Sequence, residues 1–476
     1  MSRLAFTMKL SAAASLLLAV IACAASAGGE SSAETSPSAY PSPASTHPLS
    51  TSSTSLPERR HVVGLYRVDP ATLQPIPGSE PVTSGDWISG SSSNNGDWLV
   101  LNVWIDTEPD TDIVRVVDVS TGDVVTHWQG PLLHDLVVGD DGSVYRGTQT
   151  CGQGASRMAP GTDRFSAVFD SFPAEFCPVA PMTPLDRDRL GWFGWISENP
   201  DEYQAGIVIG DMSDGSVALT LLPSVTVGSV GEQDLGDWVA LELIEPAVVW
   251  DSERDRAYVI HADQPQVSLV DLTTGDLSEH SLEKQTWVDG LLTWLMPPAQ
   301  AKGPSFGVKK YAALSPSGDV LYTGGEQSEV VTVEDGTWRV ETFPRGIDVI
   351  STDTWEVLTR FEIPASQLTL SPDGKHLVTT GVEVVDTLSS SGTNPTGAFI
   401  IGTDTMEVVA EVDYPGEWHP DVQFSADSRY AYLTHFWGGK IAIVDLENGR
   451  TLDQLTGSER LTVFGEAAML STPIRP

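Results

Sequence analysis

Four histidines stand at similar places beside short apolar segments of the chain. His134 and His419 come just before such segments, in LLHDLVV and EWHPDVQF. His261 and His435 come just after them, in AYVIHADQ and AYLTHFWGG. If these segments are equivalent strands of a repeating fold, the four imidazoles are candidate ligand-binding groups at one end of a central channel. They could hold copper or zinc or act as acid and base. The alternative is that each ring bonds a loop carbonyl, since no fixed histidine spacing of a metal site is present.

An acidic segment, DTEPDTD, is the second candidate. Its side chains alternate in a predicted loop: Asp106, Glu108, Asp110 and Asp112. Carboxylate oxygens suit a hard cation such as Ca²⁺, but the glycine and terminal glutamate of a helix–loop–helix calcium site are missing. A solvated acidic loop is the alternative interpretation. No cofactor is therefore predicted, and Ca²⁺ here or Cu or Zn at the histidines remain alternatives.

The third candidate is a single residue, Cys23, which follows a segment typical of a signal peptide. Arg3 and Lys9 precede an apolar run over residues 10–22, which is too short to span a bilayer comfortably. The run ends in VIAC, which resembles the lipobox of bacterial lipoproteins. The resemblance implies that residues 1–22 are removed and that the Cys23 sulfur carries lipid, such as palmitate. Two alternatives stay open: ordinary cleavage at ASAG, residues 25–28, or an unmodified Cys23.

The segment after Cys23 has the composition of a flexible tether. Residues 28–57 are almost all Ser, Thr, Pro, Ala and Gly, and they show no apolar period. Such a segment cannot bury a core. We predict a disordered tether over residues 23–58, a folded domain over residues 59–476, and a lipid-anchored protein on the extracytoplasmic face of the cell membrane. A freely secreted protein is the alternative.

Two further cysteines, Cys151 and Cys177, remain in the predicted folded domain. In an exported protein such a pair usually forms a disulfide. Neither has a Cys-x-x-Cys partner or a close histidine in the sequence, which disfavours a metal site. We therefore predict a Cys151–Cys177 disulfide.

The histidines, the acidic segment and the cysteine pair lie in a domain built from a repeated hairpin. In LTLSPDGKHLVTTG, residues 368–381, two apolar segments flank Ser371-Pro372-Asp373-Gly374, whose residues suit a type I turn closed by glycine. Similar segments begin near residues 90, 135, 247, 312 and 422. Each is followed by a second hairpin such as VSLVDLTTGDL or IAIVDLENGR. The two hairpins together predict four antiparallel strands per repeat.

Four-stranded sheets that repeat at this spacing bury their faces by stacking around an axis. We therefore predict an all-β fold, a single β-propeller. The segments YVIH…VSLVDLTTGDL and YLTH…IAIVDLENGR resemble the YVTN-type propeller repeat of secreted and surface proteins over about residues 245–455. That resemblance implies binding or scaffolding and transfers no catalytic residue. Counting the first hairpins favours seven blades. The chain ends either add a strand to that ring or build an eighth blade.

The net charge and the absence of several motifs disfavour some classes of partner and enzyme. The formal charge is −39, from 65 acidic and 26 basic residues, which disfavours a nucleic-acid partner. The sequence lacks a nucleophile elbow, a His-Glu-x-x-His motif, a phosphate-binding P-loop and a dinucleotide fingerprint. Aromatic residues at Trp192, Phe193 and Trp195 are predicted to be buried rather than to bind a sugar.

These observations favour a binding or scaffold module for a protein, peptide or glycan over an enzyme. The enzyme alternative is a quinoprotein-like dehydrogenase or a metal-dependent oxidase or lyase with a site on the channel face. A purely structural protein of the cell envelope is a third interpretation.

Overall fold

The structure, a computed structural model, describes one body built from strands. All described residues belong to a compact unit that spans residues 60–476. The described residues are 61–67, 69–74, 76–77, 83–85, 87–93, 96–104, 111–131, 136–147, 151–173, 176–199, 202–234, 239–282, 305–332, 338–387, 391–412, 421–425, 427–435, 440–456, 462–464 and 467–473. The predicted signal peptide and tether lie outside them. One 3₁₀ turn, Ser252–Arg254, interrupts the strands.

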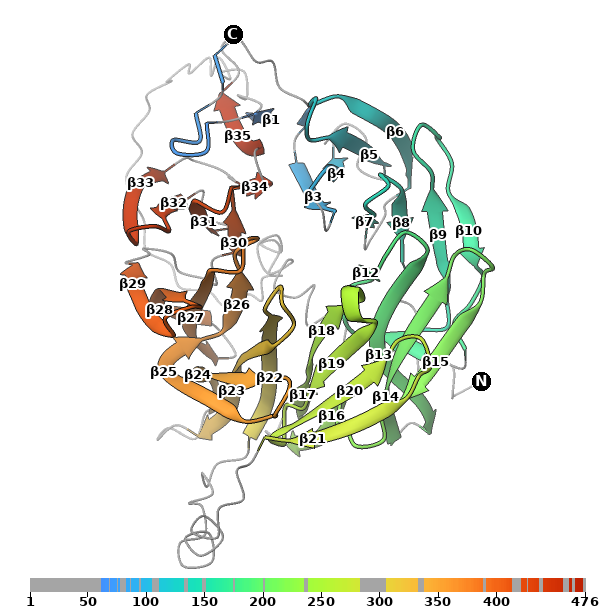
Figure 1. Ribbon diagram of the computed structural model, residues 1–476, viewed down its shortest axis with the longest axis vertical. Helices are drawn as coiled ribbons and strands as arrows, with labels where there is room; N and C mark the ends of the chain where they lie inside the picture. The colour runs from blue at the N-terminus through green and yellow to red at the C-terminus, as the bar shows by residue number, and fades with distance from the viewer. Residues whose placement is uncertain are drawn as a thin grey trace, which may run out of the picture. The chain divides into compact units, whose positions relative to one another are not determined.

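Most strands form antiparallel groups of four, named here blades 1 to 8 in chain order (Figure 1). Blade 3 has five strands, and blades 5 and 6 are joined in one larger sheet. Blade 1 contains β3 (Trp87–Ser92), β4 (Trp98–Trp104), β5 (Thr111–Asp118) and β6 (Val124–Pro131). Blade 2 contains β7 (Leu136–Val138), β8 (Val144–Arg146), β9 (Ala155–Met158) and β10 (Ser166–Phe169). Blade 3 contains β11 (Phe176–Pro178) and β12 (Thr183–Pro184), both paired with β13 (Arg189–Asn199), then β14 (Glu202–Asp211) and β15 (Val217–Leu221). A hairpin of β16 (Gly228–Asp234) and β17 (Val239–Glu245) follows.

The remaining blades complete the order. Blade 4 contains β18 (Ala247–Asp251), β19 (Arg256–Ile260), β20 (Gln266–Asp271) and β21 (Leu277–Ser281). Blade 5 contains β22 (Ser305–Leu314), β23 (Val320–Thr332), β24 (Trp338–Ser351) and β25 (Val357–Ala365). Blade 6 contains β26 (Gln367–Leu370), β27 (His376–Thr387), β28 (Ser391–Gly402) and β29 (Glu407–Val412). Blade 7 contains β30 (Asp421–Phe424), β31 (Tyr430–His435), β32 (Lys440–Asp445) and β33 (Arg450–Thr456). Blade 8 contains β34 (Thr462–Phe464), β35 (Ala467–Pro473), β1 (His61–Arg67) and β2 (Thr83–Gly85).

The blades close into a ring, which confirms the β-propeller prediction. Consecutive blades touch through β3 and β7, β7 and β12, β18 and β22, β22 and β26, β29 and β33, and β31 and β34. Blades 3 and 4 share one apolar core, which joins Phe193 and Ile207 to Val259. Strand β34 contacts β3, so the last blade meets the first. Figure 1 shows β3, β7, β12, β18, β26, β30 and β34 around the centre of the ring.

The two ends of the chain form one sheet. Strand β1 pairs with β35 in antiparallel register from His61↔Pro473 to Arg67↔Ala467. β2 and β34 flank them, so blade 8 mixes the first and the last strands of the chain, drawn in blue and red in Figure 1. Among the described residues this arrangement corresponds to the eight-blade alternative. The preference for seven blades is not confirmed.

Side-chain oxygens explain why the first hairpin recurs. Ser371 Oγ accepts the His376 N–H at 3.0 Å and donates to Asp373 Oδ1 at 2.8 Å. Equivalent serines accept the N–H five residues ahead in three other blades: Ser93 from Trp98, Ser315 from Val320 and Ser425 from Tyr430. These bonds satisfy a backbone donor inside each turn, so the leading serine specifies the turn geometry locally.

Bonds near the same end of the strands join five pairs of neighbouring blades. Asp373 donates its N–H to Ser428 Oγ in blade 7 at 3.0 Å, and Tyr432 donates to the Pro70 carbonyl in blade 8 at 2.8 Å. Similar bonds join blades 1 and 2, 3 and 4, and 4 and 5: Trp98 to the Asp140 carbonyl, Arg189 to Asp255, and Arg254 to the Ser317 carbonyl. We call this end of the ring the turn face and the opposite end the loop face.

Candidate functional site

Most of the predicted site residues lie outside the described residues. This is so for Cys23, His134, His419, Asp106, Glu108 and Asp110. Asp112 lies near the start of β5, and His435 ends β31; both positions are at the loop-face ends of their strands. Within the described part of the chain, no group of three or more His, Cys, Asp or Glu side chains is placed to hold a metal ion.

His261 is the one predicted channel-face histidine whose side chain is described. It follows β19 at the loop face, but its side chain is buried, with 1% of its surface exposed. Its Nε2 lies 2.8 Å from Ser268 Oγ, which is also buried. A Ser–His pair could serve nucleophilic catalysis only if a substrate reached it. In this arrangement the pair is part of the core of blade 4.

The buried imidazole makes the stability of the domain depend on pH. Burial lowers the pKa of His261, against the opposing charges of Asp263 and Glu279. The unfolded chain therefore binds a proton below about pH 6.5 that the folded ring takes up only at lower pH. The contribution of His261 is fully present above that pH and is lost as the pH falls through this window. Burial lowers the pKa of His280 and His376 in the same direction.

We expect the urea midpoint of unfolding to fall between about pH 7.5 and pH 5.5, and His261→Gln to reduce this dependence. His127→Gln, on the exposed surface of β6, is the matched control and should leave the dependence unchanged. Equal pH dependence in the wild type and His261→Gln would contradict this assignment.

The predicted disulfide is confirmed. Cys151 and Cys177 are bonded, with a separation of 26 residues in the chain. Cys151 follows β8 of blade 2, and Cys177 lies in β11 of blade 3. The bond therefore joins two neighbouring blades near the loop face and closes a loop that contains β9 and β10.

Removal of this disulfide should destabilise the ring by about 3 kcal/mol, because the unfolded chain regains the freedom of a loop of this size. The measurement is the free energy of urea unfolding of Cys151→Ser/Cys177→Ser against the oxidised wild type. Reduction of the wild type with dithiothreitol should give the same loss. An unchanged free energy in both experiments would show that the crosslink does not support the fold.

The aromatic residues near β13 are core residues, as predicted. Trp192 and Phe193 are 1% and 2% exposed. The Trp192 ring meets Phe169 and Phe172 edge to face, with ring centroids 5.5 and 5.1 Å apart. These rings fill the space between blades 2 and 3 and are not available to stack a sugar.

The most distinctive surface is an extended sheet that joins the β16–β17 hairpin to blades 5 and 6 on the loop face. β17 pairs in parallel with the start of β22, from Leu243↔Gly307 to Glu245↔Lys309. β23 and β24 extend beyond their blade, and β24 pairs with the extension of β27. We call the strands β16–β17 and these extensions of β22, β23, β24, β27 and β28 the loop-face sheet. It joins the blades by backbone hydrogen bonds instead of side-chain packing alone.

A charged row crosses the loop-face sheet. Glu245 on β17 and Glu326 on β23 are the register partners of Lys309 on β22. Lys309 Nζ lies 3.2 Å from Glu245 Oε2 and 5.3 Å from the centre of the Tyr311 ring. The Tyr311 hydroxyl donates to Glu326 Oε2 at 3.4 Å. Glu326 is buried, so this row fixes the register of three strands at the loop face.

The pKa shifts in this row do not favour acid–base chemistry. Burial raises the pKa of Tyr311, with further help from the charges of Glu326 and Glu245. Burial lowers the pKa of Lys309, but Tyr311 and Glu245 outweigh it, so the net shift is upward. Both groups therefore keep their ordinary protonation at neutral pH, whereas an acid or base is most effective with a pKa near 7.

Other side chains of the loop-face sheet are available to a partner. Phe343 on β24 is 40% exposed. The polar groups around it are already paired: Arg339 with Glu341, Gln327 with Glu329 at 2.9 Å, and Ser328 with Thr342 at 2.8 Å. An exposed ring among ordered polar groups is a common pattern in protein-binding surfaces.

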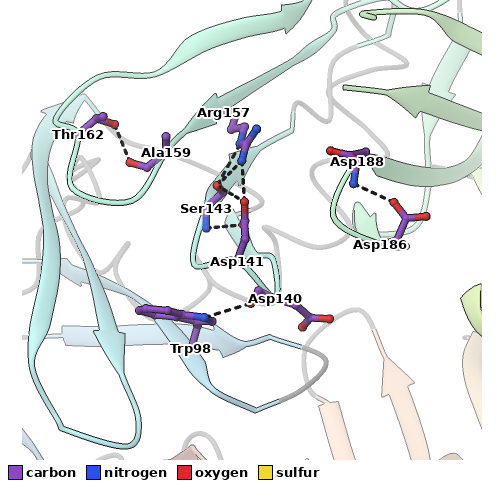
Figure 2. Close-up of polar contacts among 9 residues, drawn as sticks. All are labelled: Trp98, Asp140, Asp141, Ser143, Arg157, Ala159, Thr162, Asp186 and Asp188. Carbon is purple, nitrogen blue, oxygen red and sulfur yellow. Dashed lines mark hydrogen bonds and ion pairs between the residues drawn. The ribbon is translucent and has the colours of Figure 1, made fainter. Parts of the chain in front are cut away.

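On the turn face, blade 2 carries a polar network (Figure 2). Arg157 Nη2 donates to Asp141 Oδ2 at 2.6 Å and to Ser143 Oγ at 2.8 Å. Ser143 also donates its N–H to Asp141 Oδ1 at 2.8 Å. Asp188 donates its N–H to Asp186 Oδ1, at 2.8 Å, in the neighbouring turn of blade 3. The network satisfies its own donors and acceptors, so we interpret it as support for the turn.

Comparisons with known proteins give no family. No protein-family model matches the chain, and no curated protein matches it. Among solved structures, the chain is similar to dihydro-heme d1 dehydrogenase NirN in complex with DHE, at 14% identity over 84% of this chain and 79% of that one, with a TM-score of 0.36. It is similar to a eukaryotic initiation factor at 11% identity over 88% and 100%, with a TM-score of 0.42. It is also similar to the β-propeller domain of Myceliophteria thermophila Cps50 (Swd1), at 13% identity over 78% and 87%, with a TM-score of 0.34.

Proposed function

We propose that this protein is a lipid-anchored, extracytoplasmic binding module that recognises a protein, peptide or glycan through the loop-face sheet. The observation that carries the proposal is the sheet itself, a surface continuous from the β16–β17 hairpin across blades 5 and 6, with an exposed aromatic ring, Phe343, among paired polar groups. A rigid surface loses little conformational entropy on binding, which favours recognition.

The sequence supports the anchor and the repeat type in this proposal. Cys23 ends an apolar segment, and a Ser/Thr/Pro-rich segment separates it from the propeller. The hairpin pairs of blades 4 and 7 carry the resemblance to YVTN-type repeats. No helix in the described ranges has the length and hydropathy needed to cross a membrane.

Capture from envelope extract tests the binding surface. Immobilised wild-type domain should enrich a partner, and Phe343→Ser should reduce the amount captured about tenfold, because central aromatic side chains dominate binding energy. Val124→Ser is the matched control, since Val124 is also 40% exposed but lies on the outermost strand of blade 1. Equal capture by Phe343→Ser and Val124→Ser, or no enrichment by the wild type, would contradict the proposal.

Elemental analysis tests the enzyme alternative. Stoichiometric copper, zinc or calcium in the purified exported domain would favour a metal site at the histidines or at the acidic segment 106–112. Under the binding proposal, the metal content should stay well below one ion per chain and partner capture should persist in chelator.

A further inference from the structure

Three cationic side chains of blade 5 are directed to one face of its sheet. Thr323 on β23 is the register partner of both Ala312 on β22 and Asp348 on β24, and Asp348 in turn pairs with Arg360 on β25. Register partners share a face, as do residues two apart in a strand. Lys310 therefore lies on the same face as Asp348 and Arg360.

The Lys310 side chain lies beside a glycine of the neighbouring strand. Gly325 is the register partner of Lys310, and a Cβ added to Gly325 would lie 3.2 Å from Lys310 Cδ. The lysine stem therefore lies close over the bare backbone of β23. The β23–β24 register shifts between Thr323 and Glu326, and the β24–β25 register shifts beside Arg345. Pro344 is the register partner of Glu326, and Glu326 is the register partner of Lys309, so Arg345, the next residue of β24, lies on the Lys310 face. The charge of Arg345 also acts on the pKa of Lys310.

The charges of this cluster are not balanced around Lys310. Arg360 Nε lies 2.5 Å from Asp348 Oδ1. No hydrogen bond or ion pair joins the Lys310 ammonium or the Arg345 guanidinium to another side chain of the described strands. Burial, Arg345 and Arg360 lower the pKa of Lys310, and Asp348 alone opposes them. Burial also lowers the pKa of Arg345, against the opposing charge of Glu329, and the charge of Glu362 helps to raise the pKa of Arg360.

Such a cluster is unusual in a chain with 65 acidic and 26 basic residues, where carboxylates are abundant partners. Two cations left without a paired carboxylate repel each other, and an anion between them removes that repulsion. Guanidinium groups bind phosphate oxygens through two parallel hydrogen bonds, and an ammonium adds a point charge.

We propose that Lys310, Arg345 and Arg360 form a binding site for a phosphate group on blade 5. The three residues lie on one face of the sheet, and Asp348 orients Arg360 through their ion pair. Arg345 and Arg360 are exposed, so the site is open to a ligand. A dianionic phosphate matches the surplus of two positive charges among Lys310, Arg345, Arg360 and Asp348. This site does not depend on whether the loop-face sheet binds a macromolecule.

Inorganic phosphate is the probe for the test, by isothermal titration and thermal unfolding of the whole exported domain at constant ionic strength. The wild type should bind phosphate saturably and melt at a higher temperature in its presence, more than in chloride. Lys310→Gln/Arg345→Gln should weaken binding at least tenfold. Phosphorylated and unphosphorylated sugars or peptides then distinguish a free phosphate ligand from a phosphorylated one.

The controls separate a lost site from a lost fold. Lys375→Gln/Arg164→Gln removes the same charge from exposed turn residues, whose side chains are 65% and 89% exposed, and should bind like the wild type. Without phosphate, Lys310→Gln/Arg345→Gln should melt no lower than the wild type, because it removes mutual repulsion. If that variant fails to fold, Arg345→Lys with Lys310→Arg should retain binding. No saturable binding by the wild type, or equal binding by the double variant, would overturn the proposal.

Discussion

Truncation after Thr456 is expected to abolish cooperative folding of the propeller. The deletion removes β34 and β35, which supply half of blade 8 and the contact that returns the ring to blade 1. β1 loses all seven of its register partners in β35 and keeps only the short strand β2. A two-stranded hairpin is marginal alone, and an opened ring exposes the facing sides of blades 1 and 7 to water.

The measurement is thermal unfolding followed by circular dichroism, together with binding of a dye for exposed apolar surface. The wild type should unfold in one sharp transition, and the truncated chain should show a broad transition and strong dye binding. Deletion of residues 474–476 alone is the control and should preserve the sharp transition, because β35 ends at Pro473. A sharp transition at an unchanged temperature in the chain truncated after Thr456 would refute closure by the terminal strands.

Substitution of Cys23 by Ala should remove all lipid from the protein and release it from the membrane fraction. The prediction rests on the VIAC sequence, where small Ala22 and the end of the apolar segment precede Cys23. Each buried methylene of an acyl chain contributes about 0.8 kcal/mol to membrane affinity, and stable anchoring needs more than one chain or signal. Loss of the only proposed attachment point therefore changes the partition of the protein almost completely.

Metabolic labelling with palmitate and fractionation of cells test this prediction. Ala27→Leu provides the control, because it blocks ordinary cleavage at ASAG but leaves the VIAC sequence intact. Lipid on the wild type and on Ala27→Leu, but not on Cys23→Ala, is the expected pattern. A wild-type protein that carries no label and is secreted after cleavage before Gly28 would favour the secreted alternative.

Local sequence was enough to predict much of the fold. Ser371, Asp373 and Gly374 form their turn through bonds within a few residues, so the repeated pattern of these types predicted the hairpins and the propeller. The cysteine pair was also predictable, because the two cysteines of the predicted folded domain have one simple pairing. The burial of Trp192 followed from its place in an apolar strand.

The candidate sites were less predictable from sequence. The predicted histidines were chosen for their position near the loop face, yet the His261 ring is buried against Ser268, which only packing decides. The sequence analysis did not select Glu245, Lys309 and Tyr311 as candidate site residues. The sequence does carry one signal for this region, because Asp335-Gly336 between Val-rich segments is typical of a hairpin. Lys310, Arg345 and Arg360 are separated by 35 and 15 residues in the chain, so no short motif links them.

The sequence by itself determined the strands, their turns and the disulfide pair, because each depends on neighbouring residues or on a simple pairing. Only the tertiary structure decided that the chain ends share blade 8, that the loop-face sheet joins the β16–β17 hairpin to blades 5 and 6, and that Lys310, Arg345 and Arg360 lie on one face of blade 5. These features depend on register between distant strands. Ring closure and bulges set that register, and neither can be predicted from a single segment of the chain.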